Sequence, residues 1–145
     1  MKQALLTLIL IFNLSNVFSQ NDCEKCEIEK AKVINNNLDQ LDFKLVSDFL
    51  CTFDEACKTV VEYSEWSNET LYTILERNPA LVLSVLEKIP DHDLILINIQ
   101  NPVHDGFNYQ SIFNKISDNT TSTEIQKKIL ESLIIAAEKE GIEIE

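Results

Sequence analysis

The sequence predicts an all-α protein, either an irregular helical bundle or a short stack of helical pairs, with disulfides stapling its N-terminal third. First, apolar residues recur at spacings of three and four through most of the chain after residue 22, which is typical of amphipathic helices. Second, two glycines and three prolines in 145 residues are too few for the closely spaced turns of a sandwich or barrel. Third, all four cysteines fall between positions 23 and 57.

Residues 1–19 predict a secretory signal peptide, which would leave residues 20–145 as a single helical domain. One positive charge precedes an apolar run at 4–12, and the small residue Ser19 stands at the expected cleavage site. The run is about half of the ~20 residues that a membrane-spanning helix needs. Its ending, Phe-Ser-Gln, resembles bacterial secretory signals. We therefore expect a secreted or periplasmic protein whose mature chain does not insert into a membrane.

The strongest helix signal in the N-terminal half follows residue 52. Thr52 and Glu55 have the spacing of a capping box, in which two side chains bond the free amides of a helix start. Behind them, apolar side chains recur at i, i+3, i+4, i+7 and i+8, at Phe53, Ala56, Cys57, Val60 and Val61. This stripe predicts a helix over 53–61 with Val60 in the core.

Start and stop signals place the other helices. Asn78 followed by Pro79 is typical of a helix start, and Asn37 with Gln40 three residues later predicts an N-cap. Gly141 follows the last periodic residue, where a C-terminal glycine is common. These signals and the apolar periodicity predict helices over 22–34, 38–49, 68–75, 79–89, 109–116 and 124–140.

Two further expectations concern the second half of the chain. Val85 and Ile129 lie within apolar stripes and are predicted to be buried. The segment Leu94–Ile99 fits a strand by its alternation and β-branched residues, and a short helix by its neighbours. The sequence does not decide between a strand and a helix for this segment.

The cysteines Cys23, Cys26, Cys51 and Cys57 predict two disulfides, because their number is even and the chain carries an export signal. If the first two helices form an antiparallel hairpin, Cys51 returns beside the start of the first helix. We therefore expect pairing between helices, either Cys23–Cys51 with Cys26–Cys57 or the swapped set.

The sequence gives less support to two other functions of the cysteines, a redox centre and a zinc site. Cys23-Glu24-Lys25-Cys26 has the CxxC spacing of a thiol–disulfide redox centre, but acidic neighbours disfavour a reactive thiolate. A zinc site would need tighter spacing than the five residues between Cys51 and Cys57. The sequence therefore favours structural disulfides, with no metal and no cofactor.

The only histidines, His92 and His104, lie in turn-like segments beside aspartates. They could serve as metal ligands or as an acid–base pair, but no nucleophile motif accompanies them. We interpret them as solvated loop residues and expect no enzyme activity. Asn68 and Asn119 match glycosylation acceptors, and for a bacterial chain we interpret them as helix-start residues.

The chain is strongly acidic, with 12 basic and 24 acidic side chains and a net charge of −12. Removal of the signal takes away Lys2 and no acid, so the mature chain is more acidic still. This charge opposes binding to nucleic acid or to an anionic membrane. It favours a non-enzymatic protein-binding module, inhibitor-like or immunity-like, for a basic partner. The alternatives are a carrier of an apolar small molecule between helices, and a redox protein using Cys23 and Cys26.

The single tryptophan marks the candidate partner-binding surface, which comprises Glu62, Tyr63, Glu65, Trp66 and Glu69. If the helix from residue 53 continues through Trp66, this ring lies on an acidic face and forms an exposed anchor. If the helix ends near Ser64, Trp66 folds back onto the core. The second arrangement is favoured, because Ser64 and Ser67-Asn68 are typical of a helix boundary.

Overall fold

The computed structural model describes residues 23–119 and 123–144. These residues form helices and no strand, so the all-α prediction is confirmed. The helices are α1 (Ile28–Asn36), α2 (Phe43–Leu50), α3 (Val61–Arg77), α4 (Pro79–Leu86), α5 (Asp93–Gln100), α6 (Tyr109–Ser117) and α7 (Glu124–Lys139), with short 3-10 helices η1 (Leu38–Gln40) and η2 (Glu55–Thr59). The predicted signal peptide at 1–19 lies outside the described residues.

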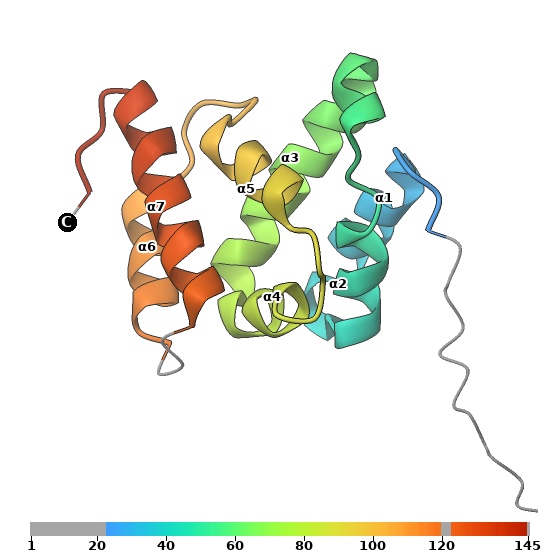
Figure 1. The fold of residues 1–145 in the computed structure, drawn as a ribbon, viewed down its shortest axis with the longest axis horizontal. Helices are drawn as coiled ribbons and strands as arrows, with labels where there is room; N and C mark the ends of the chain where they lie inside the picture. Colours follow the sequence, from blue (N-terminus) through green and yellow to red (C-terminus); the bar gives the residue numbers. More distant parts are fainter. Residues whose placement is uncertain (1–22, 120–122, 145) are drawn as a thin grey trace, which may run out of the picture.

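Helix α3 runs through the middle of the molecule (Figure 1). It packs against α1, α4, α5 and α6, while α7 packs against α5 and α6. In the view of Figure 1, α1 and α2 lie on the right and α6 and α7 on the left. One continuous hydrophobic core joins all seven helices.

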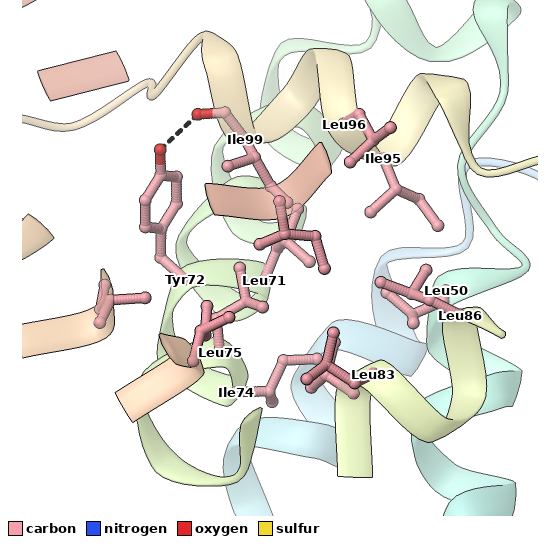
Figure 2. Close-up of a cluster of buried hydrophobic side chains, with 14 of the residues drawn as sticks. Leu50, Leu71, Tyr72, Ile74, Leu75, Leu83, Leu86, Ile95, Leu96 and Ile99 are labelled. Carbon is pink, nitrogen blue, oxygen red and sulfur yellow. Dashed lines mark hydrogen bonds between the residues drawn. The ribbon is translucent and has the colours of Figure 1, made fainter. Parts of the chain in front are cut away.

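The core lies where α3, α4 and α5 meet (Figure 2). Leu71 and Leu75 of α3 are fully buried, as is Ile99 of α5. Val85 and Ile129 have no exposed surface, so their predicted burial is confirmed. Truncating such a side chain to alanine typically costs about 2–5 kcal/mol, because a cavity remains.

The predicted helix signals at Asn78, Pro79 and Gly141 are confirmed. Asn78 Oδ1 accepts the Leu81 amide at 3.2 Å, with Pro79 as the first helical residue. Thr123 and Gln126 form a reciprocal capping box at the start of α7. Gly141 follows the end of α7 with φ +70°, a conformation that glycine adopts without strain.

The segment Leu94–Ile99 is helical and forms most of α5. A helix places Ile95, Leu96 and Ile99 on one buried face, whereas strand alternation would separate Leu96 from the other two. A lone strand would also have no neighbouring strand within the described residues to satisfy its backbone.

The predicted helix over 53–61 is wrong. Asp54 accepts the Ala56 amide at 3.0 Å and starts a 3-10 turn, which ends at the non-helical Val60. Helix α3 starts afresh at Val61. Val60 is 42% exposed, so its predicted burial is wrong, although Cys57 of the same stripe is buried. The disulfide at Cys57 holds this turn in place of a longer helix.

The predicted boundary within α3 is also wrong, because the helix continues from Val61 to Arg77. Ser67 donates to the Ser64 carbonyl at 3.3 Å, so its hydroxyl is satisfied within the helix. Asn68 is fully buried and bonds another segment. Both residues serve the packing of a continuous helix.

The N-terminal elements begin later than predicted. Helix α1 starts at Ile28, because Cys26 has φ +58° and donates its amide to Thr52 O at 2.9 Å. Asn37 caps no helix start, since its side-chain amide donates back to the Val33 carbonyl at 2.8 Å. Asp42 caps α2 instead, by accepting the Leu45 amide at 2.8 Å.

Candidate functional site

Two disulfides join Cys23 to Cys51 and Cys26 to Cys57, with Cα–Cα distances of 6.0 and 5.4 Å. The predicted pairing between segments is confirmed in the first of the two sets, as is the predicted hairpin that brings Cys51 back to the start of α1. All four cysteines are paired, and Cys23 is not bonded to Cys26. The structure therefore holds two cross-links in place of a CxxC disulfide.

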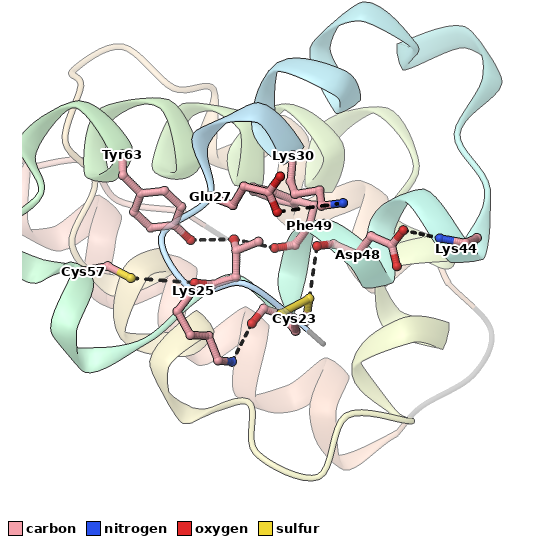
Figure 3. Close-up of a disulfide and its surroundings, with 11 residues drawn as sticks. Cys23, Lys25, Glu27, Lys30, Lys44, Asp48, Phe49, Cys57 and Tyr63 are labelled. Atoms are coloured by element: carbon pink, nitrogen blue, oxygen red, sulfur yellow. Dashed lines mark hydrogen bonds and ion pairs between the residues drawn. A yellow bond between two sulfur atoms is a disulfide. The ribbon is translucent and has the colours of Figure 1, made fainter. Parts of the chain in front are cut away.

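A buried polar chain connects this disulfide region to α3 (Figure 3). Thr52 Oγ1 donates to the Phe49 carbonyl at 2.7 Å, so the hydroxyl of Tyr63 donates to Thr52 Oγ1, also at 2.7 Å. Burial raises the pKa of Tyr63 to about 12. The Phe53 ring packs edge-on against Tyr63 with centroids 6.1 Å apart.

The candidate partner-binding residues divide into an exposed set and one buried residue. Tyr63 is only 3% exposed and turns into the core, so it does not lie on the surface. Trp66 is 38% exposed, and Glu62, Glu65 and Glu69 are exposed. We call these four residues the acidic face of α3.

The acidic face of α3 has a simple geometry. Glu62, Trp66 and Glu69 follow at i, i+4 and i+7, which aligns them along one side of the helix. Trp66 lies one turn before Thr70, whose hydroxyl oxygen accepts the Asn35 side-chain amide of α1 at 2.8 Å. Trp66 therefore lies one helical turn from a contact with α1, and Glu62 and Glu69 lie on the same side of α3.

The charges of this face are only partly compensated. In the part of the chain that the structure describes, no cation lies within 4.0 Å of the carboxylates of Glu62, Glu65 or Glu69. Lys32 of α1 bonds Glu29 at 2.7 Å, and this hydrogen bond raises the pKa of Lys32, with smaller contributions from the charges of Glu29 and Glu62. The face therefore keeps unpaired negative charge.

Asn68 is a structural residue that the sequence reading missed. Its side-chain amide donates to the Asn98 carbonyl at 2.8 Å, and its Oδ1 accepts the Val103 amide at 2.9 Å. The side chain is fully buried, so the glycosylation motif at 68–70 has no accessible amide in the folded chain. The prediction of Asn68 as a helix-start residue is wrong, because it lies in the middle of α3. Asn119 follows α6, and the rest of its motif lies outside the described residues.

A cluster of aromatic rings joins α3 to α6 and to the loop before α6. Tyr72 stacks on Phe107 with centroids 4.1 Å apart, and the Tyr72 hydroxyl donates to the Ile99 carbonyl. Tyr109 meets Tyr72 edge-on and donates to the Glu140 carboxylate. Burial raises the pKa of both tyrosines, and for Tyr109 the bond to Glu140 adds to it. These hydroxyls are committed to structural bonds.

The histidines lie on different segments. His92 precedes α5, and its Nδ1 is buried without a hydrogen-bond partner. His104 is exposed in the loop between α5 and α6. Among the described residues, no three His, Cys, Asp or Glu side chains are grouped to hold a metal ion.

The described surface carries several open recesses. One of about 300 Å³ borders the Cys23–Cys51 disulfide, between α1 and α2. Another of about 450 Å³ lies between the α4–α5 turn and the start of α7, and is lined by Leu86, Glu87, Ile89, His92, Thr123, Glu124, Ile125 and Lys128. Such a volume falls in the range of ~300–1,000 Å³ that is usual for small-ligand sites.

No known protein family matches this chain, and no curated protein or solved structure is detectably similar to it. None of the described helices has the length and apolar character that crossing a bilayer requires. The class that the fold defines is an acidic all-α protein with two disulfides in its N-terminal part. Two disulfides are compatible with an extracellular or periplasmic protein.

Proposed function

We propose that this protein is a secreted or periplasmic, non-enzymatic binding module that holds a basic partner protein on the acidic face of α3. The observation that carries the proposal is the exposed Trp66 ring, 38% accessible, set among three glutamates that pair with no described cation. Tryptophan is enriched at the centres of binding interfaces, where a large rigid ring fills a pocket on the partner.

The charge of the chain supports a basic partner. Complementary charge accelerates encounter and excludes partners of the same sign. A chain with 24 acidic and 12 basic side chains attracts a cationic surface from every direction. The glutamates beside Trp66 would then pair with lysines or arginines around the buried ring, as an inhibitor-like or immunity-like protein would neutralise a basic target.

The disulfides support a location outside the cytoplasm. Cross-links persist in oxidising compartments and are rare where glutathione keeps thiols reduced. They also hold the start of α3, because Cys57 lies within the 3-10 turn η2 that leads into this helix. The start of the helix that bears the acidic face is therefore held by a disulfide. This rigidity lowers the conformational entropy lost when a partner binds.

Selection from a displayed random-peptide library tests the proposal, with the oxidised protein as bait and NMR to map the bound site. We expect the selected peptides to combine lysine or arginine with an apolar residue, and to shift the amides of residues 62–69. Trp66→Ala should weaken the binding at least ~10-fold, because truncation of a hot-spot residue costs about 2 kcal/mol or more.

A charge-matched pair of variants separates local contacts from general attraction. Neutralising Glu62, Glu65 and Glu69 to glutamine should weaken peptide binding far more than the same change at Glu131, Glu138 and Glu143, which are also exposed. Equal weakening by both triple variants, or peptides that map elsewhere, would contradict this site. Binding should also decline as salt screens the exposed charges.

The recess between the α4–α5 turn and the start of α7 favours a second candidate function, the carriage of an apolar small molecule. Its floor contains Leu86, Ile89 and Ile125, and its volume is about 450 Å³. A hydrophobic fluorescent probe that binds here should lose its site in Ile89→Lys and keep it in Ile97→Lys, since Ile97 is 42% exposed and outside the recess. Equal probe signals from both variants would set this candidate aside.

A further inference from the structure

The two disulfides differ in their exposure. Cys23 and Cys51 are both partly exposed, and both line the open recess of about 300 Å³ between α1 and α2 (Figure 3). In the other disulfide, Cys26 is partly exposed and Cys57 is only 4% exposed. The recess that Cys57 borders is much smaller, at about 50 Å³. A small thiol therefore has room to reach one disulfide and lacks room at Cys57.

The charges around the exposed disulfide nearly balance. Lys44 pairs with Asp48, and Lys30 lies 3.9 Å from Glu27, with all four side chains in the same recess. Glu24 is the remaining charge of the recess, and next to the recess Lys25 Nζ donates to the Cys51 carbonyl at 2.7 Å. The approach of a thiolate is thus opposed by little net charge, and water and salt screen what remains.

Opening the exposed disulfide leaves the fold anchored by its neighbour. Cys26 lies three residues after Cys23, keeps its own disulfide to Cys57, and donates its amide to Thr52 O at 2.9 Å. Helix α1 follows directly and buries Ala31 and Ile34 in the core. Only the short stretch before Cys26 loses its covalent tie to the end of α2.

We infer that the Cys23–Cys51 disulfide is a thiol–disulfide exchange site for a small dithiol, opened while Cys26–Cys57 and the helical fold remain intact. A thiolate of the dithiol attacks Cys23 Sγ, because Cys51 Sγ is flanked at 3.1 Å by the Asp48 carbonyl oxygen. The Cys23–Cys51 bond breaks, a mixed disulfide forms on Cys23, and Cys51 leaves as a thiolate that takes up a proton.

The second thiol of the reagent completes the exchange. After losing its proton it attacks its own sulfur in the mixed disulfide and closes the oxidised reagent, so that Cys23 leaves as a thiolate and is protonated. The dithiol is oxidised by two electrons, and the protein gains two electrons and two protons as two thiols. The exchange requires no oxidant, reductant or cofactor other than the disulfide and the dithiol.

Stepwise reduction by dithiothreitol under native conditions tests this inference, with alkylation of the freed thiols and peptide mapping by mass spectrometry. We expect a two-thiol species labelled at Cys23 and Cys51, formed at least ~10-fold faster than the four-thiol species because exchange depends on access. Its far-UV circular dichroism should match that of the oxidised protein. Labels on Cys26 and Cys57 first, simultaneous opening of both bonds, or loss of helix at the two-thiol stage would overturn the inference.

A matched pair of double variants adds a control. Cys23→Ala with Cys51→Ala should fold and resist the dithiothreitol concentration that opens the exposed bond in the native protein. Cys26→Ala with Cys57→Ala should still lose its remaining disulfide at the native rate. If the second variant fails to fold, the order of labelling in the native protein decides the question alone. The result is independent of the proposed partner binding, because neither variant alters the acidic face of α3.

Discussion

The N-terminal region before α3 and the region from α5 to α7 are held together by different means. Before α3, two disulfides join short helices and 3-10 turns that also bury side chains such as Val46 and Phe49. From α5 onward, the helices pack through buried faces without a cross-link, and α6 and α7 begin at side-chain caps. A covalent bond constrains the unfolded chain, so irregular backbone survives where packing alone would favour longer helices.

The largest expected effect breaks the packing of α4 and α7 in the core. Val85→Asp and Ile129→Asp should each unfold the protein, because both residues are fully inaccessible and a buried unpaired carboxylate costs several kcal/mol. Thermal melts monitored by circular dichroism measure this. Val60→Asp is the matched control, since Val60 is 42% exposed and its melting temperature should stay close to that of the parent. A native-like melt for Val85→Asp would refute the packing of α4.

The next effect breaks the cross-linked region. Replacing Cys26 and Cys57 by alanine should lower the free energy of unfolding by about 3 kcal/mol, as expected for a closed loop of this length. Chemical denaturation measures the loss, and hydrogen exchange should locate it in α1, α2 and η2. Equal loss of protection in α6 and α7 would show that the two regions unfold as one unit.

Asn68 joins α3 to the loop that follows α5, so its replacement tests the contact between these two segments. Asn68→Ala should destabilise the protein by about 2 kcal/mol, because the Asn98 carbonyl and the Val103 amide lose their buried partner. Asn68→Asp keeps the acceptor for Val103 but loses the donor for Asn98. The Val103 amide should therefore exchange faster in the alanine variant than in the aspartate variant. Identical exchange in both would contradict the assigned bond.

High pH should weaken the link between the disulfide region and α3. The pKa of Tyr63 is raised to about 12 in the folded protein, against about 10 when unfolded. Its contribution is fully present below pH 10 and is lost as pH rises toward 12, by an amount on the order of 2 kcal/mol. Tyr63→Phe should flatten this part of the stability profile in alkaline denaturation. An unchanged slope would place the alkaline loss at other groups.

The smallest effect concerns the surface of α3. Trp66→Ala should change the free energy of unfolding by less than about 1 kcal/mol, because the ring is 38% exposed. Iodide should quench the fluorescence of this single tryptophan to a degree between that of buried and free indole. Complete protection from iodide would mean that Trp66 packs inside, as the sequence favoured.

The sequence predicted the structure well where helices are held by packing and local caps, and less well where disulfides hold the chain. In α4 and α7, local signals at Asn78 and Gly141 agree with the packing, so these helix boundaries and the buried faces were predictable. Before α3, Cys26 in a left-handed conformation and the turn at Cys57 depend on partners about 30 residues away. Local periodicity contains no information about such partners, so the predicted helix over 53–61 failed there.

The candidate site shows the same division. Sequence reasoning selected the exposed glutamates and Trp66, because charge and a single large aromatic are visible in composition. It placed Tyr63 on the same surface, although one residue along a helix turns the side chain by about 100°. It also missed the role of Asn68, whose partners lie about 30 residues further along the chain.

The sequence by itself determined the all-α class, the pairing of cysteines between segments, the acidity, and most helices after residue 78, because these follow from composition and local periodicity. Only the tertiary structure decided that α3 is continuous, that Leu94–Ile99 is helical, that Tyr63 is buried with Trp66 exposed, and that Cys23–Cys51 borders an open recess. The physical reason is that burial and long-range hydrogen bonds depend on which segments meet, and weak local preferences yield to these contacts.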